Sequence, residues 1–217
     1  MSRPAAIIVR NLGTQDYLPV YEAMSRVTAG RDAHSADEFW LVEHPSVFTQ
    51  GRNGDPAHLL APGDIPVVDI DRGGQVTYHG PGQIVLYTLI DLPRAGFGVR
   101  DLVSALEHSV IALLAEHHIE AAARPDAPGV YVDGAKIAAL GLRVKRGRSY
   151  HGLSLNVDMA LEPFSRINPC GYKGMEVTML RELGVQASQS ALAARLCDLL
   201  AADLGYNARQ FCEESPL

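Results

Sequence analysis

The strongest constraint on the fold is a nearly continuous apolar run at Ile84–Leu89, in the middle of the chain. A run of this length fits a strand that is buried on both faces. Two segments with apolar residues at helical spacing, Val99–His118 and Ser188–Leu204, could cover such a strand. The apolar face of the first begins at Val99, and Ser188 or Ser190 is a plausible N-cap for the second.

Shorter signals fill most of the remaining chain. Further strands are expected at Ala5–Val9, Glu38–Glu43 and Pro66–Ile70, a further helix at Asp16–Gly30, and a loop with one short helical turn at Gly51–Gly63. Val130–Val157 is typical of two or three antiparallel strands, with turns at Asp133-Gly134 and Arg146-Gly147. We therefore expect residues 1–217 to form a single α+β domain, with a mixed, mostly antiparallel sheet flanked by helices.

Composition excludes several classes of protein. The net charge of −6 argues against general nucleic-acid binding, and no apolar stretch is long enough to cross a membrane. The three cysteines, Cys170, Cys197 and Cys212, form neither a disulfide framework nor a CxxC zinc pair. At least one free thiol favours a reducing, cytoplasmic location. The histidines show no metal-site pattern, so we expect no metal.

A basic cluster interrupts this acidic chain at Arg143, Lys145, Arg146 and Arg148. One interpretation is a hairpin tip that faces water. The other is a docking patch for an acidic carrier protein, which would act mainly on the rate of encounter. The sequence leaves both open.

The segment from Arg72 to Gln83 is the first that could carry chemistry. It combines four glycines with Thr77, Tyr78 and His79 immediately before the apolar run. Glycine allows the backbone to approach a ligand closely, so a ligand-lining loop competes here with an ordinary glycine-rich hairpin. The segment lacks the Lys-Ser/Thr ending of a P-loop, so a nucleotide is not indicated.

Two further residues are candidate reactive groups. Lys136 follows a tight turn and enters an apolar strand, where burial would favour the neutral amine, a usable base. A lysine at a strand end that points to water is the alternative. Cys170 stands between Pro169 and Gly171 on irregular backbone, where a reactive thiol is as plausible as a packed one. Cys197 and Cys212 fit structural or incidental positions.

Histidine is the usual base for a cysteine nucleophile. His79 and His151 lie in polar, glycine-containing segments and are the two candidates. The other histidines lie in helical or ordinary loop contexts, which favours a solvated or hydrogen-bonded side chain. They are His34, His44, His58, His108, His117 and His118.

Four segments in this order resemble the octanoyltransferase family of lipoate biosynthesis: RGGQVTYHGPGQIVLYTLIDL, GVYVDGAKIAALGLRV, HGLSLNV and INPCGY. The resemblance runs from about Phe39 to Leu180. It implies the fold of biotin and lipoate protein ligases, with Cys170 as the acyl-thioester nucleophile and Lys136 as its partner. It also implies an acyl site, with His151 as a possible supporting residue. The residues of that site would be Arg72, Gly73, Gly74, Gln75, Val76, Thr77, Tyr78, His79, Ala139, Leu140, Gly141, Gly152, Leu153 and Ser154.

The resemblance further implies a reaction. Octanoyl-acyl carrier protein would be the donor, and the acceptors would be lysines of the lipoyl domains of 2-oxoacid dehydrogenase complexes and of the glycine cleavage H protein. Neither ATP nor a metal would be needed. Because the two groups would act as a dyad, we expect Lys136 and Cys170 to lie within hydrogen-bond distance, directly or through one water.

Three other functions remain as competing hypotheses. An ATP-dependent lipoate or biotin ligase would bind an acyl-adenylate with its lysine and would not need Cys170. A cysteine hydrolase would use His79 or His151 and release free acid. A carrier-binding module would bind without forming any covalent adduct. The sequence leaves open the chain-length preference, the oligomeric state, the carrier docking face and the preferred acceptor.

Overall fold

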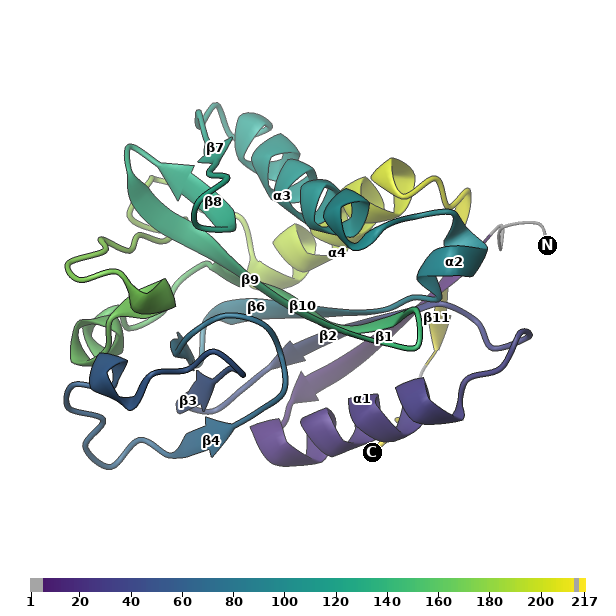
Figure 1. Cartoon of the computed structure of the whole chain (residues 1–217). Coiled ribbons are helices and arrows are strands. Elements are labelled where there is room, and N and C mark those ends of the chain that lie inside the picture. Colours follow the sequence, from purple (N-terminus) through teal and green to yellow (C-terminus); the bar gives the residue numbers. More distant parts are fainter. Residues whose placement is uncertain (1–5, 213–214) are drawn as a thin grey trace.

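The computed structural model describes residues 6–212 and 215–217, with residue 170 described by its backbone alone. Within these residues the main element is an eight-stranded sheet in the order β11-β1-β2-β6-β10-β9-β8-β7 (Figure 1). Its strands are β1 (Ala6–Thr14), β2 (Glu38–Glu43), β6 (Gln83–Leu89), β7 (Ala122–Ala123), β8 (Gly129–Val132), β9 (Ala135–Lys145), β10 (Arg148–Asn156) and β11 (Ala208–Cys212). Only β1 is paired in parallel, with β2 and with β11. The expected mixed, mostly antiparallel sheet is confirmed.

Helices cover both faces of this sheet, as Figure 1 shows. On one face α3 (Val99–Ala115) and α4 (Gln189–Asp203) pack over a large apolar cluster, joined by the short α2 (Leu92–Ala95). On the other face α1 (Tyr17–Gly30) packs over Trp40, Tyr87 and Tyr150. The strand β6 lies between these layers and is buried along its whole length, as its apolar run predicts.

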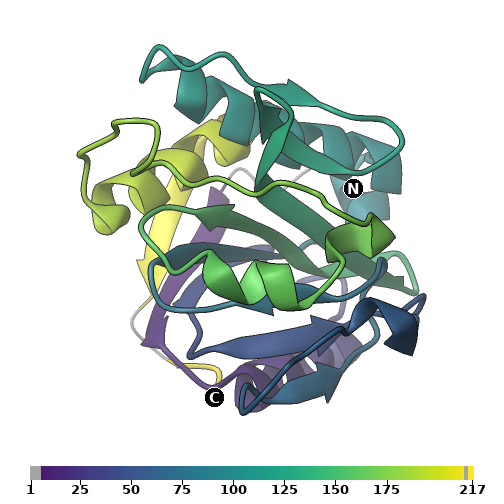
Figure 2. The ribbon, with the colours of Figure 1, turned by 90° about the vertical axis from the view of Figure 1, so that its left-hand side faces the viewer.

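A second, three-stranded sheet in the order β4-β3-β5 lies on the same side of the main sheet as α1 (Figures 1 and 2). Its strands are β3 (Val47–Gln50), β4 (Val67–Asp69) and β5 (Thr77–His79). Three short 3₁₀ turns flank it: η1 (Pro56–His58), η2 (Glu162–Arg166) and η3 (Pro169–Gly171). A separate apolar cluster of Phe48, Tyr78 and Phe164 holds this sheet to η2.

Several expected boundaries are confirmed and others are wrong. Ser188 caps α4 by accepting a hydrogen bond from the backbone N–H of Ala191, and the two expected turns have positive φ at both central residues. In contrast, α3 ends at Ala115 rather than His118, because His118 has left-handed backbone with φ 60°. Val99 is 46% exposed, because the first residue of α3 lies at the helix end, outside the apolar face.

The sequence patterns also missed β3, β7 and β11, left β5 inside a loop or hairpin, and placed the end of β1 five residues too early. The helices of the described residues are too short or too polar to span a lipid bilayer.

Candidate active site

The site is formed on the face of the main sheet opposite α3 and α4. Across β9, β10 and β6 the register aligns side chains in rows: Ala139, Ser154 and Val85 form one row. Gly141, Gly152 and Tyr87 form the next row. Towards the start of β9, Asn156 pairs with Gln83, and Lys136 lies beside Asn156 in the wall of a small cavity. These rows give the site a direction, from a lysine end at Lys136 to a glycine end at Gly141 and Gly152.

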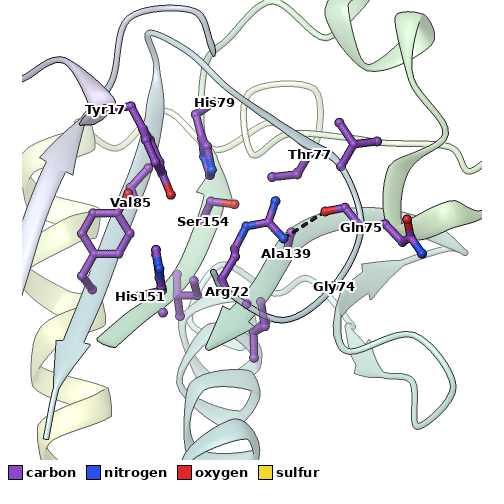
Figure 3. Close-up of a pocket in the computed structure, with 16 residues that line it drawn as sticks. Tyr17, Arg72, Gly74, Gln75, Thr77, His79, Val85, Ala139, His151 and Ser154 are labelled. Carbon is purple, nitrogen blue, oxygen red and sulfur yellow. Dashed lines mark hydrogen bonds between the residues drawn. The ribbon is translucent and has the colours of Figure 1, made fainter. Parts of the chain in front are cut away.

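Two connected cavities follow this direction. The larger has mostly apolar walls and extends over both rows to the glycine end (Figure 3). The smaller lies at the lysine end and is lined by Lys136, Asn156 and Pro169 among others. Because Thr77, Ala139 and Ser154 line both, the two cavities adjoin. An acyl chain placed in the larger cavity would therefore present its carbonyl to the lysine end.

The structure brings most of the residues expected at an acyl site around the larger cavity. Of the fourteen named above, its walls include Arg72, Gly74, Gln75, Val76, Thr77, His79, Ala139, Leu140, Gly141, Gly152, Leu153 and Ser154. Gly73 lies in a neighbouring surface depression, and Tyr78 packs into the apolar cluster under η2 with its hydroxyl bonded to Ser46. Tyr17, Val85 and Tyr87 also line the cavity. Val85 and Tyr87 fall within the quoted motif from Arg72 to Leu92 but were not expected at the site, and Tyr17 in α1 lies outside every motif.

The glycine-rich loop covers the cavity because Arg72 holds it in place. The Arg72 guanidinium is nearly buried and donates to the carbonyls of Gly73 and Gln75 within the loop. It also donates to the carbonyl and hydroxyl oxygens of Thr49 in β3. The N–H of Gly73 donates to the carbonyl of Leu142 at 2.9 Å and ties the loop to β9. Arg72 therefore acts here as a scaffold for the loop.

Lys136 is buried, with 4% of its surface exposed, so the interpretation as a lysine that points to water is wrong. Its ammonium donates to the carbonyl of Pro128 at 3.1 Å and lies 5.2 Å from the ring centroid of Tyr131. Gly129 makes room for it: a Cβ there would lie 2.7 Å from Lys136 Cε. A buried amine held beside a cavity can exchange protons with a ligand in that cavity.

The predicted nucleophile, Cys170, falls in η3, and its side chain lies outside the described residues. The expected hydrogen-bond distance between Lys136 and Cys170 is therefore untested. The backbone around it is described: Pro169 lines the cavity of Lys136, and Gly171 has φ 81°. The chain continues alongside β9, where Thr178 N–H donates to the carbonyl of Lys136 at 3.0 Å.

The other two cysteines are in settings that suit packing. Cys197 is fully buried in α4, and this burial raises the pKa of its thiol to about 12. Cys212 lies in β11, where its sulfur accepts a hydrogen bond from Arg10 at 3.0 Å. Both lie away from the two cavities, whose walls belong to other elements. Neither is a good nucleophile for a ligand bound there.

Three buried histidines surround the cavity on the α1 side. Burial lowers the pKa of His79 to about 3, with the charge of His44 as a further cause. Burial also lowers the pKa of His44 to about 4, partly offset by its hydrogen bond to the carbonyl of Gln15. The pKa of His151 is lowered by burial as well, against the effect of Asp71. All three are neutral near pH 7, which suits a cavity for an uncharged chain.

His44 lies in a loop, and its fully buried ring is hydrogen-bonded at both nitrogens, which is one of the two expected settings. Its Nε2 accepts a hydrogen bond from the Tyr87 hydroxyl at 2.8 Å, so it supports a wall of the cavity from behind. His58 also has a structural position. Its carbonyl accepts from the N–H of Asn168 at 2.8 Å and holds the start of η3.

Known proteins agree with this architecture. A family model described as the lipoyl protein ligase A/B catalytic domain matches residues 16–201. A Pseudomonas putida (strain W619) protein named octanoyltransferase is 61% identical over 197 residues, which cover 91% of this chain and 92% of that one.

Solved structures extend the likeness to the fold. A bipartite lipoate protein ligase from Thermoplasma acidophilum superposes with a TM-score of 0.71 at 13% identity, covering 99% of this chain and 87% of that one. A biotin protein ligase from Aquifex aeolicus, in complex with biotin and ATP, gives a TM-score of 0.57 at 13% identity, covering 91% and 69%. At such identities the fold alone is shared, and it is the expected fold of lipoate and biotin ligases. The identity to the curated relatives is far higher, and with the family model it shows that the chain belongs to the octanoyltransferase family of acyltransferases, within the lipoyl protein ligase A/B catalytic domains.

Proposed function

We propose that this protein transfers an octanoyl group from the thioester of an acyl carrier protein to a lysine of a lipoyl domain, through an acyl thioester on Cys170. The observation that carries the proposal is the buried Lys136 at one end of an apolar cavity, beside the turn that contains Cys170. The lipoyl domain as acceptor is supported by the neighbour from T. acidophilum, which is described with its E2 lipoyl domain.

The first half-reaction moves the acyl group onto the protein. The Lys136 ammonium favours the thiolate form of Cys170, which is the nucleophile. The thiolate attacks the carbonyl carbon of the donor thioester, a new C–S bond forms, and the bond to the pantetheine sulfur breaks. Lys136 gives its proton to the departing pantetheine thiolate and becomes neutral. The exchange of one thioester for another is close to isoenergetic.

The second half-reaction releases the product. The amine of the acceptor lysine attacks the acyl-Cys170 carbonyl, a C–N bond forms, and the C–S bond breaks to restore the thiolate. The excess proton of the amine passes to neutral Lys136, which returns to an ammonium. One side chain thus acts first as acid and then as base. Because an amide is more stable than a thioester, we propose that neither ATP nor a metal is required.

The cavity supports a medium-length acyl chain. At about 0.8 kcal/mol for each buried CH₂, an octanoyl tail would gain roughly 5 kcal/mol from the apolar walls. The gain favours octanoyl over acetyl but discriminates weakly between chains that differ by two carbons. A free thiol nucleophile also suits a reducing compartment, so we propose a cytoplasmic location.

The test is intact mass after incubation with octanoyl-carrier protein and no ATP. We expect wild type to gain one octanoyl group that hydroxylamine removes, Cys170→Ala to gain none, and the matched control Cys212→Ala to behave as wild type. Addition of a lipoyl domain should then move the group into a bond that resists hydroxylamine.

Other outcomes of this experiment, and of a companion reaction with octanoate and ATP in place of the carrier protein, identify the competing functions. Full transfer by Cys170→Ala from octanoate and ATP would identify a ligase. Rapid release of free octanoate without transfer would identify a hydrolase. Tight binding of the carrier with no adduct would leave a binding module.

A further inference from the structure

The larger cavity ends among polar groups, although an octanoyl tail ends in a methyl group. At the glycine end, Gly152 is preceded in β10 by His151, and the rings of Tyr17 and His79 also line the cavity (Figure 3). His151 and Tyr87 pack edge to face, with ring centroids 6.0 Å apart. A wall built only to hold a hydrocarbon would have aliphatic side chains at these positions.

The acyl chain spans most of the distance to this polar end. From the lysine end at Asn156 to Gly152 the strand advances four residues, or about 13 Å. An extended eight-carbon chain spans about 9 Å, and the thioester bond adds about 2 Å. An octanoyl group that starts beside Lys136 therefore ends close to Gly152 and His151.

His151 has an unusual backbone conformation for a strand residue. Its φ is 61°, and consequently its ring lies on the same side of β10 as that of Tyr150, with ring centroids 5.0 Å apart. Adjacent residues of a regular strand would point to opposite faces. Left-handed backbone costs free energy in a residue with a Cβ, and such strain concentrates at functional sites. The strain here places an imidazole in the cavity wall.

One nitrogen of this imidazole has no protein partner. His151 is 1% exposed, and its Nδ1 makes no hydrogen bond with any group in the described part of the chain. The Nε2 lies 3.4 Å from a carboxylate oxygen of Asp71. Burial opposes ionisation of Asp71, but hydrogen bonds from His151 and Tyr150 outweigh it and lower the Asp71 pKa to about 2. The carboxylate can only accept, so Nε2 carries the proton and Nδ1 is a bare acceptor.

His79 presents a second acceptor to the same cavity. Asn156 donates its amide N–H to the carbonyl of Thr178 at 3.0 Å, so its Oδ1 accepts from Gln83. The Oε1 of Gln83 must then accept from Nδ1 of His79 at 2.8 Å. This chain of bonds leaves Nε2 of His79 without a proton. A saturated acyl tail can satisfy neither this acceptor nor the one on His151.

We propose that His151 forms a binding site for a hydrogen-bond donor at the ω end of the acyl cavity, with His79 as a second acceptor on the cavity wall. With an octanoyl chain the donor is water, which limits the length of chain that fits. With an acyl chain that carries an ω-hydroxyl the donor is the substrate itself. The inference rests on the proposed acyl transfer. Buried waters typically occupy polar sites of this kind, where each makes two to four hydrogen bonds.

The test compares two donors of equal length, 8-hydroxyoctanoyl- and nonanoyl-carrier protein, in the wild-type protein. An apolar cavity end would favour nonanoyl, whereas a site for a donor favours the hydroxylated chain. We expect the rate of adduct formation, by intact mass, to be on the order of tenfold higher for 8-hydroxyoctanoyl. Equal rates, or a faster reaction with nonanoyl, would overturn the inference.

A variant supplies the second measurement. His151→Gly removes the acceptor, and glycine adopts φ near 61° without strain. We expect the ratio of the 8-hydroxyoctanoyl rate to the nonanoyl rate to fall to about one in this variant, whatever its rate with octanoyl. A preference that survives the change would remove His151 from the site. If octanoyl itself forms no adduct with wild type, the proposed function fails, and this outcome is distinct from a failure of the donor site.

Discussion

On one face of β10, Leu153 and Leu155 pack into the large apolar cluster beneath α3 and α4. On the other face of the same strand, Gly152, Ser154 and Asn156 line the two cavities. We call these the core face and the site face. The core face is filled with side chains that need no polar partner. The site face leaves space and holds polar groups at fixed positions, at a cost in stability. Substitutions on the two faces should therefore affect different properties.

The largest expected effect is a loss of activity on the site face with little change in stability. Lys136→Met keeps the length of an unbranched side chain but removes the proton donor and acceptor. We expect octanoyl transfer to fall by about 10²–10⁴-fold, the usual contribution of a positioned acid or base. The free energy of unfolding should change by no more than about 1 kcal/mol, because the cost of burying an ammonium is removed together with its contacts.

Single-turnover acylation and urea denaturation check the two parts of this prediction. Lys145→Met, at the exposed end of the same strand, is the matched control and should leave both unchanged. A Lys136→Met protein with normal transfer would contradict the assigned role of Lys136.

The second prediction is the opposite result on the core face: a loss of stability with little change in activity. Leu155 is fully buried, and Leu155→Ala should lower the free energy of unfolding by about 3 kcal/mol, because it removes contacts and leaves a cavity. At a temperature well below the midpoint of unfolding, kcat/KM should stay within about twofold of wild type. Denaturation and steady-state kinetics on one preparation test this. A stable variant with low activity would show that the two faces are coupled through the strand.

The third prediction concerns how the buried histidines lower the stability of the fold at acidic pH. Burial holds the pKa of His79 at about 3 and of His44 at about 4, below the ordinary value of 6.5. The unfolded chain therefore binds more protons than the folded one below pH 6.5, and stability falls as the pH falls from there towards 4. Each histidine should cost about 1 kcal/mol between pH 6.5 and 5.5.

Urea denaturation at pH 7.0 and 5.5 gives the measurement. His44→Gln should lose part of the pH dependence, whereas the exposed His34→Gln should keep all of it. Stability that is unchanged between the two pH values would mean that these histidines accept protons in the folded state.

The comparison also explains what the sequence could and could not predict. Elements that pack on the core face show a regular pattern of apolar residues within one segment of the sequence. Ile84–Leu89 and α4 could therefore be identified from local signals, as could the two hairpin turns from their glycines. β11 could not, because it is a short and mostly exposed edge strand. It forms only through parallel pairing with β1 from the other end of the chain. Pairing between segments so far apart in the sequence produces no recognisable pattern in either segment alone.

Only part of the site could be predicted from the sequence. The residues of the glycine-rich loop and of β9 and β10 form recognisable motifs, and most of them line one cavity. Tyr17 and His44 lie outside the motifs, and Tyr87 lies within one without being expected at the site, since the roles of all three depend on how α1 and β2 pack against β6. The left-handed backbone of His151 was also hidden, because strain of this kind is set by the surrounding fold and not by the neighbouring residues.

The smallest expected effect tests whether positive φ in β10 and its turn always marks function. Arg146, at the tip of the β9–β10 hairpin, has φ 52°, close to the 61° of His151, but it is exposed. Asparagine tolerates this conformation better than arginine and is preferred before glycine in such turns. Arg146→Asn should therefore raise the free energy of unfolding by about 0.5 kcal/mol. Acylation by octanoyl-carrier protein should be unchanged, because the strain at the tip supports no ligand. A lower rate of acylation with intact stability would instead support the interpretation of the basic cluster as a carrier docking patch, and the loss should then diminish as salt is added.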